Sequence, residues 1–308
     1  MKSQKGSEKM ELPKNERQPN TAATKKKIWL YGKPFHGKSW TANTFPNVLF
    51  LSTDGNYKRL PGGVPPALDI VDELTFNGRA DNRKMAWEVF LDALSLLERG
   101  GNTFESIVLD NETQLRDRCR EYVLEKMKIE HEADSNFGKG WSMVDKEWEN
   151  AITRFWSLDY PNLLAISHLE DDTDVTKKSG EKISRIIPAN SKKFMMWQAT
   201  LVDIVGRCID KDGNYVISFK TNEYIFGGGR LNTRELPDIP NTYEAICKVY
   251  EKANESLGPV LRPSKKVTEE PTVAVAEVMT DETMETMETM ETPETPKRRV
   301  KKRKDDGE

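Results

Sequence analysis

The stretch from Gly32 to Ser39 constrains the fold of this chain more than any other, because it follows the spacing G-x-x-x-x-G-K-[ST]. The apolar run at residues 27–31 favours a buried strand, and residues 39–43 can begin a helix. A strand, a glycine-rich loop and a helix in this order form a cradle whose backbone N–H groups bind phosphate. The sequence therefore predicts a phosphate-binding loop at residues 32–39.

Each residue type in this loop suits contact with a nucleotide. Gly32 and Gly37 allow the backbone to approach a ligand closely, Lys38 would reach the β- and γ-phosphates, and the Ser39 hydroxyl would ligate Mg²⁺. A chance match in a glycine-rich turn is the alternative interpretation. The predicted nucleotide-binding residues are Gly32, Lys33, Pro34, Phe35, His36, Gly37, Lys38, Ser39 and Trp40.

Two further apolar runs each end in a carboxylate, as is typical of parallel strands whose ends face a ligand. The run at residues 47–54 ends in Asp54 and is expected beside strand 27–31, where Asp54 would position the water that attacks the γ-phosphate. The run at residues 104–110 ends in Asp110, which would hold Mg²⁺. These carboxylates and the loop together predict a site for a nucleotide and a metal ion.

Two acidic residues have a competing structural explanation. Asp54 precedes Gly55 and is therefore also typical of a turn. Glu112 follows Asp110 by two residues, and it is either a second candidate for orienting water or an acid that stabilises the start of a helix. The sequence is compatible with either role for each residue.

Two residues further along the chain are candidates for contact with the γ-phosphate. The run at residues 162–168 predicts a strand ending in His168, whose imidazole would sense the phosphate or simply bond to a neighbour. Arg230 follows three glycines and could reach a phosphate across a subunit boundary, or lie in a flexible surface loop. The catalytic candidates are thus Lys38, Asp54, Glu112, His168 and Arg230, and the metal ligands are Ser39 and Asp110.

Helices alternate with the predicted strands, which favours an α/β fold with a mainly parallel sheet. The charged segment at residues 170–181 is either a loop that contacts a nucleic-acid strand or a solvated hairpin tip. A hairpin is expected around Asp212-Gly213. Helices are expected over residues 81–99, 113–130, 141–158 and 243–255.

Both ends of the chain differ in composition from its middle. Residues 1–26 form a basic arm and residues 258–308 an acidic tail with a basic tip, and both are predicted to be disordered. One domain is therefore expected over residues 27–257. No apolar run is long enough for a transmembrane helix. The three scattered cysteines favour a reducing compartment, so a cytoplasmic protein without a membrane partner is expected.

The order of these motifs resembles a RecA-type ATPase core, and most closely the phage-encoded, core-only RecA-like family that includes single-strand annealing proteins. The resemblance covers residues 26–250 and rests on the loop and on the strands ending at Asp54, Asp110 and His168. It implies a three-layer P-loop NTPase sandwich of the AAA type with a RecA-like core. It also implies ATP, Mg²⁺, single-stranded DNA and self-assembly into a ring or filament.

Two positions depart from that family. Asp54 stands where a catalytic glutamate is usual and His168 where a glutamine switch is usual, so hydrolysis is expected to be slow or to rely on Glu112. The first functional hypothesis is a recombination or annealing ATPase of phage replication, with a single-strand-binding protein as a further partner. The second is a nucleotide-binding switch or scaffold with little turnover. A small-molecule kinase or GTPase ranks last, since no Asn-Lys-x-Asp motif is present.

Overall fold

The structure is a computed structural model whose described part covers most of residues 27–257, the range predicted to form one domain. The predicted basic arm at residues 1–26, apart from its last four residues, and the predicted tail at residues 258–308 lie outside the described residues. The described residues are 23–76, 81–135, 139–170, 174–176, 182–231, 233 and 236–255.

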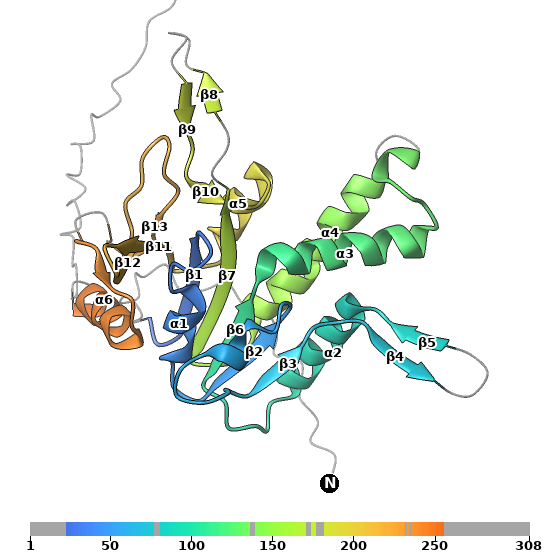
Figure 1. Ribbon diagram of the computed structural model, residues 1–308, viewed down its shortest axis with the longest axis horizontal. Helices are drawn as coiled ribbons and strands as arrows, with labels where there is room; N and C mark the ends of the chain where they lie inside the picture. The colour runs from blue at the N-terminus through green and yellow to red at the C-terminus, as the bar shows by residue number, and fades with distance from the viewer. Residues whose placement is uncertain are drawn as a thin grey trace, which may run out of the picture. The chain divides into compact units, whose positions relative to one another are not determined.

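A mostly parallel sheet forms the centre of the domain (Figure 1). Its spatial order is β14-β12-β11-β1-β7-β6-β2-β3. Strands β11, β1, β7, β6, β2 and β3 run parallel, and β12 and β14 are antiparallel to their neighbours. The strands are β1 (Lys26–Gly32), β2 (Val48–Ser52), β3 (Ala67–Asp69), β6 (Ser106–Asp110), β7 (Asn162–Glu170), β11 (Ile204–Lys211), β12 (Asn214–Ser218) and β14 (Ile239–Pro240).

The position of β2 in the sheet corrects one prediction. The sequence suggested that β2 lies beside β1, but β7 and β6 separate the two strands. The chain crosses over from β1 to β2 and later returns to fill the gap with β6 and then β7. Strands that follow one another in sequence often pair, but a crossover helix permits any spacing. The carboxyl ends of all four strands nevertheless meet at one edge of the sheet.

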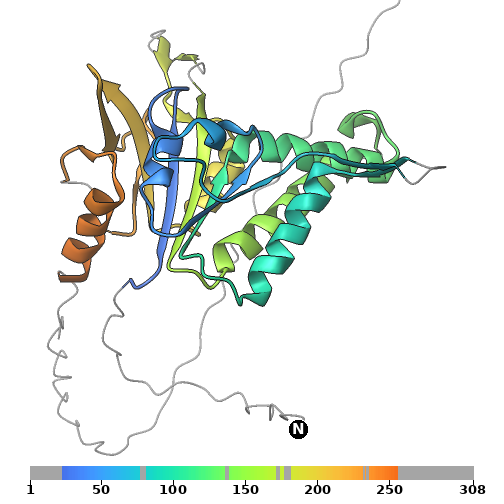
Figure 2. The ribbon, with the colours of Figure 1, turned by 60° about the horizontal axis from the view of Figure 1, so that its bottom comes forward.

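Helices cover both faces of the sheet, so the predicted three-layer α/β sandwich is confirmed (Figure 2). Alternate residues of β1 pack against helices on opposite faces of the sheet. Ile28 and Leu30 lie on one face, and Trp29 and Tyr31 lie on the other. The first, two-helix face carries α1 (Lys38–Asn43) and α6 (Tyr243–Glu255). The second, four-helix face carries α2 (Ala86–Arg99), α3 (Glu112–Met127), α4 (Lys139–Ser157) and α5 (Lys192–Gln198).

The start of the helix predicted at residues 81–99 is wrong. Helix α2 begins at Ala86, and the preceding residues form β5 (Asp81–Lys84), which pairs with β4 (Glu73–Phe76). The Ala86 N–H donates to Asp72 Oδ1 at 2.8 Å, so a carboxylate from outside the helix caps its first turn. The charged run before Ala86 has no apolar face to bury, and it pairs as a hairpin instead.

Short elements complete the described chain. The hairpin turn expected at Asp212-Gly213 is confirmed, with φ of 53° and 84° at the two residues. None of the helices in the described part has the length and apolar character needed to cross a membrane. The remaining elements are the 3₁₀ helices η1 (Asn56–Arg59) and η2 (Glu132–Asp134), the paired strands β8 (Asp174–Thr176) and β9 (Lys182–Ser184), and β10 (Ile187–Pro188) and β13 (Gly228–Gly229).

Candidate phosphate-binding site

The loop between β1 and α1 has the backbone geometry that its glycines predict. Gly37 occupies the left-handed region at φ 77° and caps α1. A Cβ atom on Gly37 would lie 2.5 Å from Asn241 Nδ2 and 3.1 Å from Tyr215 Cγ. A Cβ atom on Gly32 would lie 2.7 Å from the Cys208 carbonyl oxygen. Only glycine fits at either position. At Gly37 both the positive φ and the close neighbours exclude a side chain, and at Gly32 the close neighbours do.

The Lys38 side chain lies folded along this loop. Its Nζ donates hydrogen bonds to the carbonyl oxygens of Gly32 at 2.9 Å and Lys33 at 2.7 Å. Burial lowers the pKa of Lys38 below its usual value, and the nearby carboxylates of Asp110 and Asp54 act in the opposite direction. The Lys38 ammonium group therefore lies at the centre of the loop, where backbone carbonyl oxygens hold it.

Ser39 and Asp110 meet at the floor of the site. Ser39 Oγ donates a hydrogen bond to Asp110 Oδ2 at 2.6 Å. Burial raises the pKa of Asp110 to about 6, although the Ser39 hydrogen bond opposes the rise. Hydroxyl and carboxylate oxygens are the hard ligands that Mg²⁺ prefers, and Mg²⁺ usually takes its other ligands from water and phosphate. The pair therefore fits a magnesium ion, and no group of three or more acidic, His or Cys residues within the described ranges offers another metal site.

Asn111 joins the ends of two strands across the site. Its Nδ2 lies 3.3 Å from Asp54 Oδ2 and 3.2 Å from His168 Nε2, so the amide donates toward both groups. Burial, with the charge of Lys38 second, lowers the pKa of His168. The lowered pKa favours the neutral ring, whose Nε2 can accept from the Asn111 amide. Sequence reasoning missed Asn111, although its place between Asp110 and a helix start is a recognisable signal.

Asp54 forms the turn that its sequence context predicted, and its place at the cavity leaves the predicted role in orienting water open. Its Oδ1 accepts a hydrogen bond from the Asn56 N–H at 3.0 Å, and its Oδ2 accepts one from Asn56 Nδ2 at 2.6 Å. These bonds make the turn that Asp-Gly predicted. The same carboxylate also lines the cavity in front of the loop.

A cavity of about 480 Å³ opens in front of the loop and collects most of the predicted side chains. Asp54, Asp110 and His168 line it together with loop residues. Phe35 and Trp40 lie at its rim, 92% and 50% exposed. The loop residues lining it are Pro34, Phe35, Gly37, Lys38, Ser39 and Trp40. His36 points elsewhere, because its Nδ1 lies 3.3 Å from the Cys208 carbonyl oxygen.

Two predicted catalytic residues do not join this group. Glu112 is fully buried and accepts hydrogen bonds from Ser167 and Gln198, so it lies in the core of the four-helix face and not at the cavity. Arg230 follows β13, and its N–H donates to the Asp203 carbonyl oxygen at 2.8 Å, just before β11 begins. Arg230 therefore lies at the amino ends of the parallel strands, whereas the loop lies at their carboxyl ends.

Asn241 is the main residue of the site that sequence reasoning missed. Its Nδ2 donates a hydrogen bond to the Gly37 carbonyl oxygen at 2.9 Å, although the two residues are 204 positions apart. Its Oδ1 accepts one from Thr41 Oγ1 in α1. Tyr215 from β12 also borders the cavity and packs against Gly37. The end of the domain thus supports the loop at its beginning, and no local pattern announces this contact.

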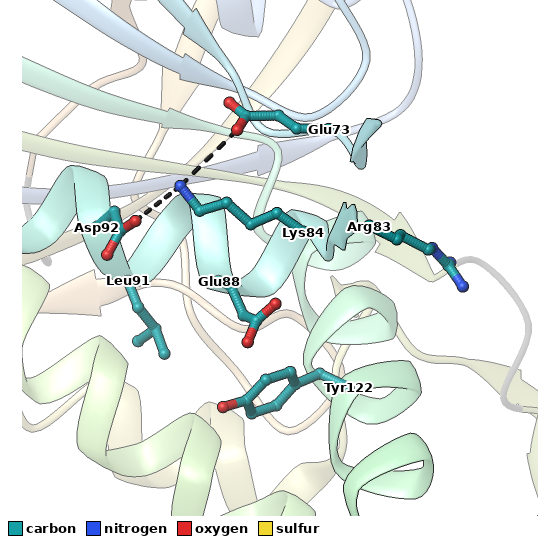
Figure 3. A pocket seen from close by; sticks show the side chains of 7 residues that line it. All are labelled: Glu73, Arg83, Lys84, Glu88, Leu91, Asp92 and Tyr122. Carbon is teal, nitrogen blue, oxygen red and sulfur yellow. Dashed lines mark ion pairs between the residues drawn. The ribbon is translucent and has the colours of Figure 1, made fainter. Parts of the chain in front are cut away.

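A second cavity, of about 540 Å³, is lined by residues of β4, β5, α2 and α3 (Figure 3). Its walls are already paired: Lys84 Nζ lies 2.7 Å from Asp92 Oδ2 and 3.8 Å from Glu73 Oε2. Glu88 accepts a hydrogen bond from the Met85 N–H at 3.1 Å. With its charges engaged and no residue of the phosphate loop in its lining, this cavity is not the candidate site.

Comparison with known proteins agrees with this geometry. A family model described as an AAA domain matches residues 24–231, which is more than half of the chain. No curated protein matches the chain. The match begins just before β1 and includes the phosphate loop and the strand ends at Asp54, Asp110 and His168. The chain therefore belongs to the AAA domain family of P-loop ATPases.

Proposed function

We propose that this protein binds ATP with Mg²⁺ in the cavity of the phosphate loop, hydrolyses it, and uses it to act on single-stranded DNA in recombination or strand annealing during phage replication. The observation that carries the nucleotide part is the convergence of Lys38, Ser39 and Asp110 with Asp54 and His168 at one edge of the sheet. A loop, a hydroxyl–carboxylate pair and two further polar groups in one cavity are the parts that phosphoryl transfer requires.

The side chains divide the work of hydrolysis between them. Lys38 would neutralise charge on the β- and γ-phosphates, which preorganised groups do at little reorganisation cost. Ser39 and Asp110 would hold Mg²⁺, which when bound supplies further charge neutralisation at the phosphate oxygens. Asp54 would orient the attacking water, and Asn111 fixes the carboxylate that does so. His168, held by the same amide, would respond to the presence of the γ-phosphate.

The segment after His168 supports the DNA part of the proposal. The Ala189 N–H donates to the His168 carbonyl oxygen at 2.8 Å, so β10 and the segment leading to α5 are bonded to the strand end that faces the cavity. A cavity of about 400 Å³ lies beside them, and Arg185, Lys192 and Met196 line it together with Glu170 and Glu223. Cationic and apolar groups side by side suit a single strand, which offers phosphates and base faces. The β8–β9 pair extends from this region (Figure 1).

Assembly into a ring or filament is part of the proposal. Arg230 lies at the amino ends of the parallel strands, away from the phosphate loop of its own chain. We therefore propose that it contacts a phosphate bound by a neighbouring copy. An arginine supplied across a subunit boundary stabilises charge in the transition state of several ATPases and GTPases.

The decisive experiment is ATP hydrolysis with and without single-stranded DNA, for the wild type and for Lys38→Ala. We expect DNA to raise the rate, and Lys38→Ala to lower it by about a hundredfold or more. Lys248→Ala, which removes an exposed lysine of α6, is the matched control and should keep the wild-type rate. A hydrolysis rate that changes neither with DNA nor with Lys38→Ala would contradict the proposal.

A second candidate function is a nucleotide switch or scaffold with little turnover. The hydrogen bonds from Asn56 and Asn111 occupy much of the Asp54 carboxylate and reduce its capacity to hold a water molecule. In that case ATP binds and changes the affinity for DNA, but the hydrolysis rate stays at background. Measuring nucleotide binding beside turnover separates the two functions.

A further inference from the structure

Phe35 holds a backbone conformation that is unusual for a bulky residue. Its φ is 65°, in the left-handed region that favours glycine. The His36 N–H donates to the Lys33 carbonyl oxygen at 3.4 Å, which closes a turn with Pro34 second and Phe35 third. Proline in the second position and a positive φ in the third are typical of a type II turn, whose third residue is normally glycine. The phosphate loop therefore carries a phenylalanine where its backbone favours a residue without a side chain.

Packing within the chain does not account for this phenylalanine. Its side chain is 92% exposed, so it buries little apolar surface. In the described part of the chain, none of the other aromatic rings packs against it. A strained conformation that burial does not offset points to a contact with a ligand.

Two more aromatic side chains border the same cavity. Trp40 lies in the first turn of α1 and Tyr215 lies on β12, and both are partly exposed. Both line the cavity together with Phe35, and Arg59 and Leu60 add a cation and a further apolar side chain to the lining. Exposed aromatic side chains gathered at one cavity are typical of a ligand-binding site.

The carboxylates of the cavity lie at its metal end. Asp110 accepts a hydrogen bond from Ser39, and Asp54 accepts hydrogen bonds from Asn56 and Asn111. In a nucleoside triphosphate the base lies beyond the ribose, at the opposite end from the γ-phosphate. The aromatic rings are the part of the lining that the proposed contacts with metal and phosphate do not use, and the face of a ring suits a base.

We propose that the ring of Phe35 stacks on the base of the bound nucleotide, and that Trp40 and Tyr215 form the other aromatic walls of this base subsite. The inference rests on the proposed function and names the part of the site that recognises the base. Because Phe35 and Lys38 belong to one loop, the loop that binds the phosphates also carries the ring that contacts the base. Stacking on an aromatic side chain typically strengthens the binding of a base by about tenfold.

The subsite favours a class of bases and not adenine alone. Stacking uses the flat face that every base has, and a purine offers a larger face than a pyrimidine. The carboxylates, which could accept a hydrogen bond from the adenine amino group, lie at the metal end. We therefore expect a site for purine nucleoside triphosphates, with affinities for ATP and GTP within about tenfold of each other.

The first test compares ATP with inorganic triphosphate, which has the phosphates but no base, both in the presence of Mg²⁺. Calorimetric titration gives the affinity of each ligand for the wild type, Phe35→Leu and Phe35→Trp. We expect Phe35→Leu to lower the affinity for ATP about tenfold and to leave that for triphosphate unchanged. Phe35→Trp keeps an aromatic face and should retain both affinities. An equal loss for the two ligands in Phe35→Leu, or no loss for ATP, would overturn the proposal.

Trp141→Leu is the matched control for Phe35→Leu. Trp141 is an exposed aromatic residue of α4, and it does not belong to the lining of the cavity. The control should keep the wild-type affinity for both ligands. A loss of ATP affinity as large as that of Phe35→Leu would overturn the assignment of the base to Phe35.

The strained conformation allows a second test, which separates ligand contact from packing. Phe35→Gly removes the ring and suits the positive φ. In urea unfolding we expect this variant to be as stable as the wild type or up to about fivefold more stable in its unfolding equilibrium constant. Its affinity for ATP relative to triphosphate should nevertheless fall as in Phe35→Leu. A variant that is markedly less stable and keeps the wild-type ratio of affinities would show a structural role for Phe35 and overturn the proposal.

The choice of base is tested with the wild type alone, by titration with ATP, GTP, CTP and UTP. We expect the two purine nucleotides to bind more tightly than the two pyrimidine nucleotides. An affinity for ATP more than about a hundredfold above that for GTP would overturn selection by stacking. Failure of the proposed function looks different, because the wild type then binds neither ATP nor inorganic triphosphate. If only the base subsite is wrong, both ligands bind and Phe35→Leu leaves the ratio of their affinities unchanged.

Discussion

Replacement of Asn241 by alanine tests whether the phosphate loop depends on the far end of the domain. The change removes the bond from Asn241 Nδ2 to the Gly37 carbonyl oxygen and the acceptor for Thr41 Oγ1. Each lost hydrogen bond is worth about 0.5–1.5 kcal/mol net. Neither partner is left bare, because the Gly37 oxygen also accepts from the Thr41 N–H at 2.9 Å and from Thr41 Oγ1 at 3.0 Å. We therefore expect a loss of about 2 kcal/mol and not the larger cost of an orphaned buried group.

The same substitution should also weaken nucleotide binding. Without Asn241 the loop loses a support beside Gly37, so its N–H groups are less preorganised and ATP affinity should fall several-fold. Urea unfolding and fluorescence titration with a labelled nucleotide measure the two quantities. The matched control is Asn214→Ala, at an exposed position in β12. If Asn241→Ala behaves like this control in both assays, the loop does not depend on the contact.

Three further predictions follow from burial, space and charge. Leu94→Ala in α2 should cost about 2–5 kcal/mol in urea unfolding because the side chain is fully buried, whereas Leu96→Ala, 56% exposed, should stay within about 0.5 kcal/mol; similar values would contradict the assigned face of α2. Gly206→Ala should destabilise by about 1–2 kcal/mol, since its Cβ would lie 2.5 Å from Ile217 Cγ2, and an unchanged unfolding midpoint would refute this. Because the pKa of Asp110 is raised to about 6, Mg²⁺-dependent nucleotide affinity should weaken as pH falls through 6; a flat titration from pH 5 to 8 would exclude that carboxylate as the metal ligand.

The residues nearest the loop were predictable because their patterns are local. The spacing from Gly32 to Ser39 requires a cradle of one shape, and the apolar runs ending at Asp54 and Asp110 are buried strands whose carboxyl ends carry polar groups. A parallel sheet brings such ends to one edge whatever the order of the strands. The sequence had suggested that β2 lies next to β1. Asp54 lines the cavity even though β7 and β6 separate these two strands.

The features that the sequence did not predict depend mostly on contacts between distant parts of the chain. Asn241 has no pattern that ties it to a loop 204 residues earlier. Whether Glu112 faces the cavity or the core depends on how α3 begins, and Asn111 Oδ1 fixes that start by accepting from the Gln114 N–H at 2.8 Å. The location of Arg230 follows from the pairing of β13 with the first residues of β11, which glycine content does not predict. The hairpin before α2 was missed because its charged residues carry no strand periodicity.

The central place of β1 affects how the chain must be made. This strand is among the first described residues to leave the ribosome, yet both its neighbours, β7 and β11, come much later. Trp29 of β1 and Ser167 of β7, whose side chains are hydrogen-bonded, are 138 residues apart. At ordinary rates of translation that separation is on the order of ten seconds. For that interval the run Ile28-Trp29-Leu30-Tyr31 has no strand to pair with, so the nascent chain is an expected client for chaperones that shield apolar segments.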